Sequence, residues 1–273
     1  MIDLIPTATA IIAELADHFV FNFKRYAIAA TVIAVLVWTL KRTAWRSRQI
    51  QKRSPGFADF RREFLASVGA IMVFAVLNIF LNWGFRIGIF HDYQGTQSLW
   101  VVALFFAAMT LGHDTYYYWT HRAMHTRLLF RTVHRYHHRS VTPSPWTAYS
   151  FSLPEAALNF IYLPVWLYFI PTPQDAIWSY VIFQIIRNTM QHAGLELHPR
   201  GTATHPIGKW IVTTTHHDMH HGGGFTHNYG AWFTFWDKLM GTEHPAYVDT
   251  FNRVTAPAGA NVPDTPCRKG TPA

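Results

Sequence analysis

Cysteine is nearly absent from this chain of 273 residues, whose only thiol is Cys267 in a proline-rich C-terminal segment. A single cysteine excludes an intrachain disulfide framework, and it excludes zinc or iron–sulfur sites built from several thiolates. Any metal would therefore be held by nitrogen or oxygen ligands. The scarcity of cysteine is compatible with the cytosolic side of a membrane.

Charged residues are also scarce, at 14% of the chain against roughly 25% in ordinary soluble domains. Aromatic residues reach 16%, and Trp and Tyr favour membrane interfaces. The formal net charge is +8, but the basic residues border apolar stretches, which suits anionic lipid headgroups better than nucleic acid. We therefore expect a membrane protein that binds no nucleic acid.

The apolar stretches predict an all-α, integral membrane helical bundle with about four to five membrane-embedded helices. The first stretch covers residues 26–40, after a mixed N-terminal segment that lacks the pattern of a removable signal peptide. The cleanest span covers 64–85, and a third runs from residue 99 without a breaker into the aromatic cluster 116–119. Lys and Arg are in excess between the first two stretches, which predicts a cytoplasmic loop.

Two shorter apolar stretches, 155–170 and 175–190, are separated by a Pro-Thr-Pro break. Each is near the lower length limit for a span, so they predict a transmembrane or re-entrant hairpin whose ends return to one face. The chain would then be multi-pass, with its histidines on the cytoplasmic side of the inner membrane in a bacterium or of the endoplasmic reticulum in a eukaryote.

The same pattern predicts a single membrane-embedded catalytic domain over residues 1–251, with its core at about 111–242. Residues 252–273 are rich in Pro, Ala, Thr and Gly and are expected to form a mobile tail.

Three sets of histidines stand at spacings of one to four residues, the first set directly after the aromatic cluster. Spacings of three and four put side chains on one face of a helix. The metal-ligand candidates are, set by set, His121 and His125; His134, His137 and His138; and His217, His220 and His221. Three such sets favour a metal site, whereas lone histidines such as His18, His91 and His244 have an ordinary structural interpretation.

Residues beside these sets leave some choices open. Asp114 and Tyr118 share the helical stripe of the first set, whereas His113 lies off it. Asp114 is well placed to hydrogen-bond the second ring nitrogen of a ligand. His216 can reach the same face as the third set, but the spacing from His217 repeats that of the second set, so His217 is preferred.

Eight imidazoles exceed the roughly three to five protein ligands of one ion, so their number predicts two metal ions. Imidazole suits iron, zinc, copper or nickel, and the sequence does not choose among them by affinity. No Glu-x-x-His motif, of the kind that soluble di-iron bundles use, occurs in the chain. The site would thus be a histidine-rich version on another scaffold.

The motifs HRAMH, HRYHH and HHDMHH, in this order and separated by the apolar hairpin, resemble the fatty acid hydroxylase and sterol desaturase superfamily of integral-membrane di-iron enzymes. The resemblance covers about residues 111–242 and includes NYG at 228–230 and FWDKLMGT at 235–242. This ending is more similar to the sterol-type branch than to the branch acting on ceramide-bound acyl chains.

The resemblance implies a helical membrane fold with a cytosolic, histidine-rich cap that holds two iron ions. It implies an enzyme of lipid biosynthesis that uses dioxygen to hydroxylate or desaturate a sterol-like, fatty acyl or sphingoid lipid. The eight histidines carry over as ligands, and His192 in NTMQHAG matches a further histidine after the hairpin. Asn188 stands where some relatives have another histidine, and His198 could substitute for it.

An inert C–H bond needs a redox-active metal, which zinc is not, although zinc could occupy the same site in a purified sample. No flavin, haem or ferredoxin segment is visible, so we expect a separate reductase as electron donor. The apolar hairpin would offer a channel for lipid from the bilayer, and Trp146, Tyr149 and Phe151 are predicted to line it.

Two other classes of protein remain open, a membrane metal transporter or sensor and a zinc-dependent membrane hydrolase. Transporters hold their ligands near the membrane midplane, whereas these histidines follow the aromatic belt. Activity with zinc alone and without dioxygen would indicate a hydrolase.

Overall fold

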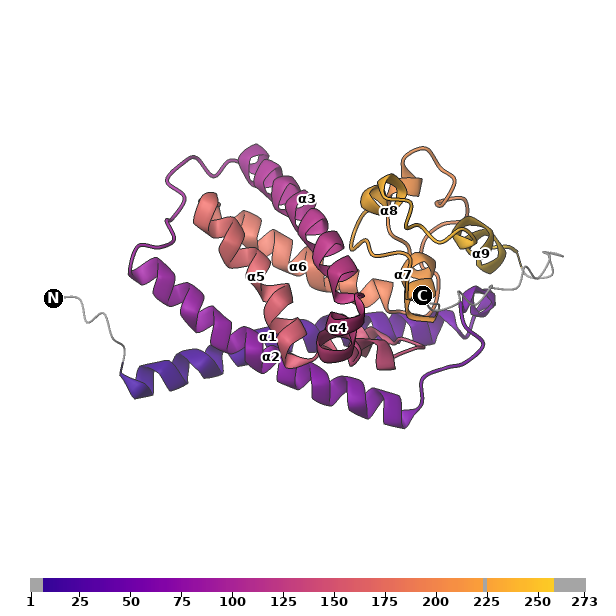
Figure 1. The fold of residues 1–273 in the computed structure, drawn as a ribbon, viewed down its shortest axis with the longest axis horizontal. Coiled ribbons are helices and arrows are strands. Elements are labelled where there is room, and N and C mark those ends of the chain that lie inside the picture. The colour runs from indigo at the N-terminus through magenta and orange to yellow at the C-terminus, as the bar shows by residue number, and fades with distance from the viewer. Residues whose placement is uncertain (1–6, 223–224, 258–273) are drawn as a thin grey trace.

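The computed structural model describes residues 7–222 and 225–257, and these residues form helices joined by loops (Figure 1). Within them no β-strand occurs beyond isolated bridges, so the predicted all-α class is confirmed. In chain order the elements are α1 (Ala8–Leu40), η1 (Ala44–Arg48), α2 (Phe57–Arg86), α3 (Leu99–Met124), α4 (Arg127–Leu129), η2 (Phe130–His134), η3 (His137–Arg139), η4 (Pro145–Tyr149), α5 (Leu153–Phe169), α6 (Gln174–Gln191), η5 (Gly208–Trp210), α7 (Thr214–Gly222), α8 (Phe235–Leu239) and α9 (Tyr247–Val254).

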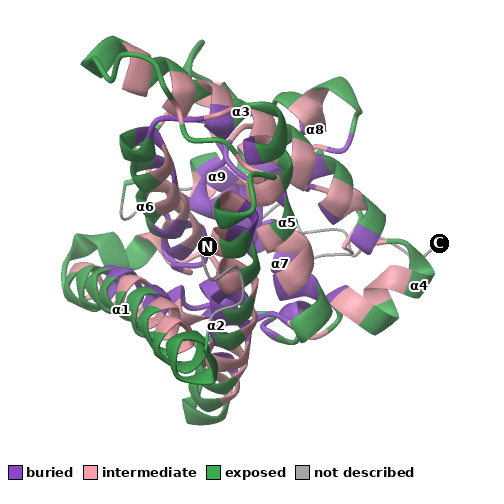
Figure 2. Ribbon diagram, turned by 90° about the vertical axis from the view of Figure 1, so that its left-hand side faces the viewer, coloured by how far each residue is buried: buried purple, intermediate pink, exposed green. Residues whose placement is uncertain are grey.

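Helices α1, α2 and α3 are long and apolar enough to cross a membrane. They expose large apolar side chains, among them Ile28 (64%), Phe80 (60%) and Leu104 (67%). In Figure 2 the outer side of α1 is exposed, while its buried residues face the rest of the bundle. Such a surface suits contact with lipid, because only apolar groups are at low cost in the hydrocarbon layer. Four to five embedded helices remain a prediction.

The first helix is longer than the sequence predicted, because α1 begins at Ala8 rather than near residue 26. Polar residues of its first half find partners on α2. Glu14 accepts a hydrogen bond from Asn82 (2.8 Å) and pairs with Arg86 (3.2 Å). Hydropathy reveals only the apolar part of such a helix. The polar first half of α1 is stabilised by contacts with α2, which hydropathy does not show.

Helices α5 and α6 form the predicted hairpin. α5 ends at Phe169 and α6 begins at Gln174, on either side of the predicted Pro-Thr-Pro break. α5 packs against α2, and α6 packs against α1 and α3. The hairpin therefore completes the bundle and encloses a space between its helices.

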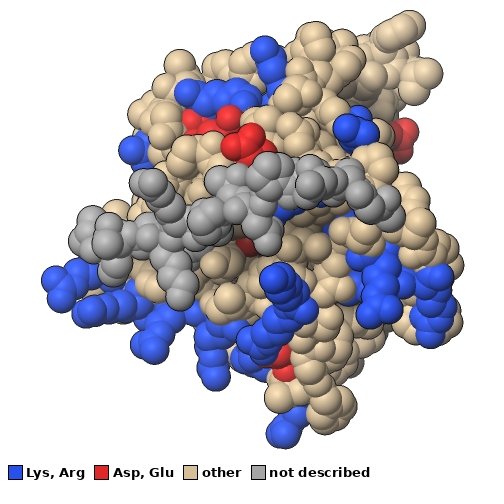
Figure 3. Space-filling model, turned by 90° about the vertical axis from the view of Figure 1, so that its right-hand side faces the viewer, with Lys and Arg blue, Asp and Glu red and all other residues tan. Residues whose placement is uncertain are grey.

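The histidine-bearing segments gather where α3 and α6 end, beside α7, α8 and α9 (Figure 1). Buried Glu63 of α2 anchors them, since it accepts hydrogen bonds from Ser140 (2.8 Å) and Ser144 (2.6 Å). Lys and Arg side chains border this end of the molecule (Figure 3). The exposed basic residues in its loops and short helices include Arg42, Arg46, Lys52, Arg53, Arg127, Arg131, Arg135 and Arg139.

The C-terminal boundary differs from the sequence prediction. Helix α9 continues to Val254, and Phe251 and Val254 are buried, so the chain remains packed past residue 252. Residues 258–273, which make up most of the predicted tail, lie outside the described residues.

Candidate metal centre

Nine histidines converge in two adjacent groups, and they are the nine that the sequence singled out as principal ligand candidates. In each group the ring nitrogens that could bind a metal lie within 4.8 Å of one another. The first group comprises His121, His125, His134, His138 and His220, and the second comprises His137, His192, His217 and His221.

Local helix geometry divides neighbouring histidines between the two groups. In α7 the side chains of His217 and His221 lie one turn apart on the same face and join the second group. His220 is rotated by about 100° from His221, so it reaches the first group. Likewise, His137 and His138 are consecutive residues of a tight turn and face different groups. Two sites thus share α7 and η3.

Hydrogen bonds in the first group orient the imidazole rings and favour one tautomer of each. Nδ1 of His121 donates to the carbonyl oxygen of Tyr229 (2.9 Å), and Nδ1 of His134 contacts the carboxyl group of Glu155 (2.8 Å), which accepts its proton when ionised. With Glu155 ionised, both Nε2 atoms carry lone pairs, yet they face each other at 3.0 Å. A cation relieves this repulsion, and two nitrogens bound at about 2.1 Å and right angles to one ion lie about 3.0 Å apart.

The second group follows the same logic. Nδ1 of His192 donates to the carbonyl oxygen of Asn188 (2.8 Å), and Nδ1 of His221 donates to that of Ser140 (3.1 Å). Their Nε2 lone pairs both face Nε2 of His217, at 3.0 and 3.2 Å. One N–H on His217 could satisfy only one of them, whereas one bound cation satisfies all three.

Further observations support the fit to metal. Nε2 of His125 is buried without a hydrogen-bond partner among the described residues. Burial lowers the pKa of His220 to about 4, so this ring is neutral at pH 7 and its lone pair is available. The residues present therefore fit two ions that prefer imidazole nitrogen.

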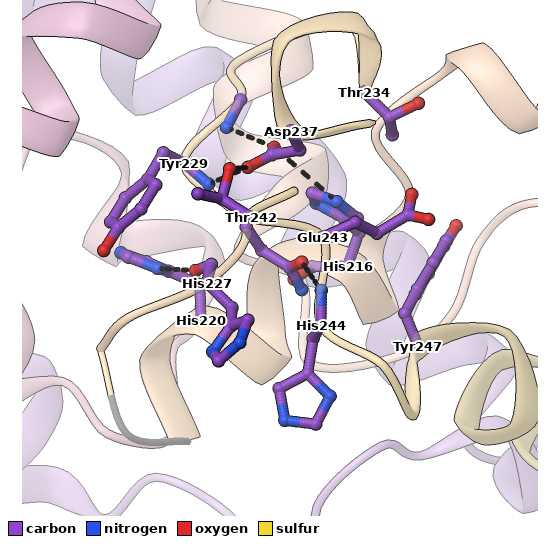
Figure 4. Close-up of polar contacts among 12 residues, drawn as sticks. His216, His220, His227, Tyr229, Thr234, Asp237, Thr242, Glu243, His244 and Tyr247 are labelled. Carbon is purple, nitrogen blue, oxygen red and sulfur yellow. Dashed lines mark hydrogen bonds and ion pairs between the residues drawn. The ribbon is translucent and has the colours of Figure 1, made fainter. Parts of the chain in front are cut away.

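A backbone segment at 227–230, which we call the carbonyl strap, orients two ligands of the first group. The carbonyl oxygen of His227 accepts from Nδ1 of His220 (2.7 Å), and that of Tyr229 accepts from His121. Buried Asp237 holds the strap by accepting from the backbone N–H groups of Tyr229 (2.9 Å) and Gly230 (2.8 Å) (Figure 4).

Asp237 also accepts a hydrogen bond from the Thr242 hydroxyl (2.8 Å). Burial raises the pKa of Asp237 to about 6, while the donors from Thr242, Gly230 and Tyr229 act against this rise. The carboxyl group is therefore ionised at pH 7, as three converging donors require. Asp237 lies in the FWDKLMGT segment, but nothing in the sequence pattern assigned it this role.

Glu155 is a second residue that the sequence analysis missed, although a carboxylate at the start of an apolar helix was a visible signal. Its bond to His134 is entirely buried. We expect Glu155→Gln to lower the metal affinity of the first group about 10- to 100-fold, because the negative charge that polarises the imidazole is lost. Iron content measured against a competing chelator tests this. Asp92→Asn, in the exposed loop before α3, should leave the content unchanged, and equal loss in both variants would contradict the role.

The remaining sequence candidates lie outside both groups. Nδ1 of His198 contacts Glu196 (2.8 Å) rather than another histidine. Both ring nitrogens of His216 lack hydrogen-bond partners among the described residues, and its nearest carboxylate is Asp237 at 3.8 Å. Asn188 contributes its backbone carbonyl to His192, while its side-chain amide donates to Ala148.

Asp114 was expected to hydrogen-bond the ring of a metal ligand, but the structure gives it other partners. Its carboxylate accepts from the backbone N–H groups of Trp232 (2.7 Å) and Phe233 (3.1 Å). Asp114 precedes His121 by two helical turns, so the stripe placed it correctly on the buried face. The chain that crosses this face, however, presents backbone donors there rather than a histidine.

A cavity of about 290 Å³ opens from the second group into the bundle. His137 and His192 line it, whereas no histidine of the first group does. Tyr149 and Phe151 lie on its wall, as the sequence predicted for a lipid channel, but Trp146 does not. Trp146 packs instead against Tyr26, with ring centroids 5.8 Å apart.

The fold and the site define a helical membrane protein with two buried histidine groups suited to metal, the second of which borders a cavity between its helices. The family model described as fatty acid hydroxylase matches residues 106–242, which is half of the chain. The chain belongs to this family. The resemblance noted in the three histidine motifs is thereby confirmed.

Curated relatives place the chain near the sterol-type branch. It is 26% identical to a Delta(7)-sterol 5(6)-desaturase of Gibberella zeae over 227 residues, which are 82% of this chain and 60% of the relative. It is 27% identical over 153 residues to a C-4 methylsterol oxidase of Schizosaccharomyces pombe, covering 54% of this chain and 48% of the relative.

A third relative, the human lathosterol oxidase, is 28% identical over 129 residues, covering 47% of this chain and 41% of the relative. The chain thus spans between 41% and 60% of the length of these three relatives. No solved structure matches it.

Proposed function

We propose that the protein is a membrane oxidoreductase that holds two iron ions and oxidises a C–H bond of a lipid with dioxygen. The observation that carries this proposal is the convergence of Nε2 lone pairs in two buried groups, one of which ends a cavity inside an apolar bundle. The family and the sterol desaturases and oxidases among the relatives support the same class of activity.

Each part of the chain has a task in this proposal. The first histidine group would hold one ion and the second group the other, with their rings oriented by the carbonyl strap, Glu155 and the carbonyls of Ser140 and Asn188. Two bound irons would supply oxygen activation, with electrons from a separate reductase. The residues that line the cavity would exclude water and hold the substrate. The cavity would bring the hydrocarbon part of the substrate beside His137 and His192.

The proposed substrate is a sterol-like, fatty acyl or sphingoid lipid that enters from the bilayer. We place the histidine groups on the cytoplasmic side, because exposed basic residues surround that end of the molecule. Residues 1–251 would form one catalytic domain, which also includes the last residues of α9 up to Val254.

Lipid analysis under labelled dioxygen tests the activity. Membranes that contain the protein should accumulate a hydroxylated or desaturated lipid that is absent from membranes with the His137→Ala variant. A hydroxylated product should carry the oxygen label, and both products should require iron and air. Product formation by zinc-loaded protein without oxygen, or metal flux across vesicles without lipid oxidation, would refute the proposal.

A further inference from the structure

Arg25 is a cation on the cavity wall without an anionic partner. Its Nη2 donates to the side-chain oxygen of Asn22 (2.9 Å) and to the hydroxyl of Tyr149 (3.1 Å), both of which are neutral acceptors. Its Nε atom is buried and has no hydrogen-bond partner among the described residues. Among residues 7–222 and 225–257, which the structure describes, no carboxylate oxygen lies within 4.0 Å of the Arg25 guanidinium.

Two other arginines of the candidate spans do have carboxylate partners. Arg62 contacts Asp59 at 2.9 Å, and Arg86 contacts Glu14 at 3.2 Å. The bundle therefore contains acidic residues that pair with arginines, and a general lack of them does not explain why Arg25 has no such partner. A charge without a counter-ion in a membrane bundle is costly, and an ionisable residue in such a place points to a functional site.

Arg25 is half-buried and lies near the middle of α1. The neighbouring Tyr26 belongs to the same buried cluster as Ile71 and Phe74, which lie in the middle of α2. On the opposite side, the Arg25 guanidinium approaches the carbonyl oxygen of Val181, in the middle of α6 (3.5 Å). The cation thus lies midway along the helical bundle rather than at one of its ends.

The cavity connects Arg25 to the second histidine group. Tyr149, whose hydroxyl contacts Arg25, lies 6.2 Å from Phe151 between ring centroids, and Phe151 lies 5.2 Å from His137. Two aromatic rings therefore separate the cation from the histidines along one wall. A ligand with its polar group at Arg25 would place a carbon several bonds away beside His137.

The wall offers a second unsatisfied donor. Nδ2 of Asn159 is buried without a hydrogen-bond partner among the described residues, and Asn159 lines the same cavity. Much of the remaining wall is apolar and includes Phe74, Leu81, Phe160, Leu163 and Leu167. Unsatisfied donors within an apolar cavity call for a ligand that supplies acceptor oxygens on a hydrocarbon body.

We propose that Arg25 binds the anionic group of an amphiphilic lipid, a carboxylate or a phosphate, and thereby sets which carbon reaches the second histidine group. A guanidinium matches the paired oxygens of either anion with two parallel hydrogen bonds. The choice of the reacting carbon rests on the proposed oxidation, whereas the binding of the anion by Arg25 does not.

Competition binding tests the proposal without iron or dioxygen. Purified protein in zwitterionic nanodiscs at pH 8 is loaded with radiolabelled palmitate, which is displaced by palmitate, hexadecyl phosphate or hexadecanol of the same chain length. We expect at least one anion to bind about 10-fold or more tightly than the alcohol, as a charge-assisted hydrogen bond implies. The tighter anion identifies the head group.

The variants assign this preference to Arg25. Arg25→Gln should remove the preference, Arg25→Lys should retain part of it, and Arg86→Gln, which alters a paired arginine, should leave it unchanged. Equal binding of anions and alcohol by the wild-type protein overturns the proposal even where Arg25→Gln does not fold, as does an unchanged preference in a folded Arg25→Gln protein. A retained anion preference in a protein that oxidises no lipid would refute only the proposed function.

Discussion

Replacing His220 by alanine is expected to lower the iron content from about two ions to about one per chain, and His217→Ala should do the same. These residues lie three positions apart in α7 but belong to different histidine groups. Each substitution removes one ligand from one site, so the double variant should retain almost no iron. Turnover should fall about 100-fold or more in each single variant, because loss of a ligand exceeds loss of the partner that orients it.

Metal analysis of the purified variants, together with product formation, measures this result. His91→Ala provides the control, because His91 lies exposed in the loop between α2 and α3. If His220→Ala and His217→Ala retain full iron and activity, the assignment of the two groups fails. If the double variant loses no more iron than either single variant, the division into two sites is wrong.

Asp237→Asn should weaken the first metal site without touching any of its ligands. The amide would set an N–H donor against one of the donors from Tyr229, Gly230 and Thr242. We expect the free energy of unfolding to fall by about 1–3 kcal/mol and iron affinity at the first group to fall about 10-fold. Thermal unfolding and chelator competition measure the two effects.

Selectivity distinguishes this role from a general loss of stability. The strap contacts His121 and His220, both of the first group, so the second ion should be retained in Asp237→Asn. Asp249→Asn, on the exposed side of α9, is the matched control. Equal loss of both ions, or an iron content identical to that of the control, would contradict the role of Asp237.

Much of the fold was visible in the sequence because helix and membrane signals are local. Apolar stretches located α2, α3 and the α5–α6 hairpin, and prolines marked the break at residues 171–173. The start of α1 was missed because Glu14 gains its partners, Asn82 and Arg86, only when α2 folds alongside. Hydropathy within one segment contains no information about a partner 68 residues away.

The candidate site, like the fold, was visible in the sequence only in part. Histidine spacing selected eight of the nine residues that converge, since side chains three or four positions apart share a helical face, and the family resemblance added His192. Glu155 and Asp237 were not identified as supporting residues, because a single carboxylate has no spacing pattern that reveals its partner. Asp114 was placed on the correct face, but its partner was misjudged because the segment at 232–233 arrives from far along the chain.

By itself, the sequence determined the helical membrane class, the family and the histidines available to bind metal, because periodicity and motif spacing are properties of short segments. Only the tertiary structure decided how these histidines divide into two groups, which group meets the cavity, and that Arg25 faces the cavity without a carboxylate. These features depend on contacts between α1, α3, α6 and α7, and such contacts exist only when the helices pack together.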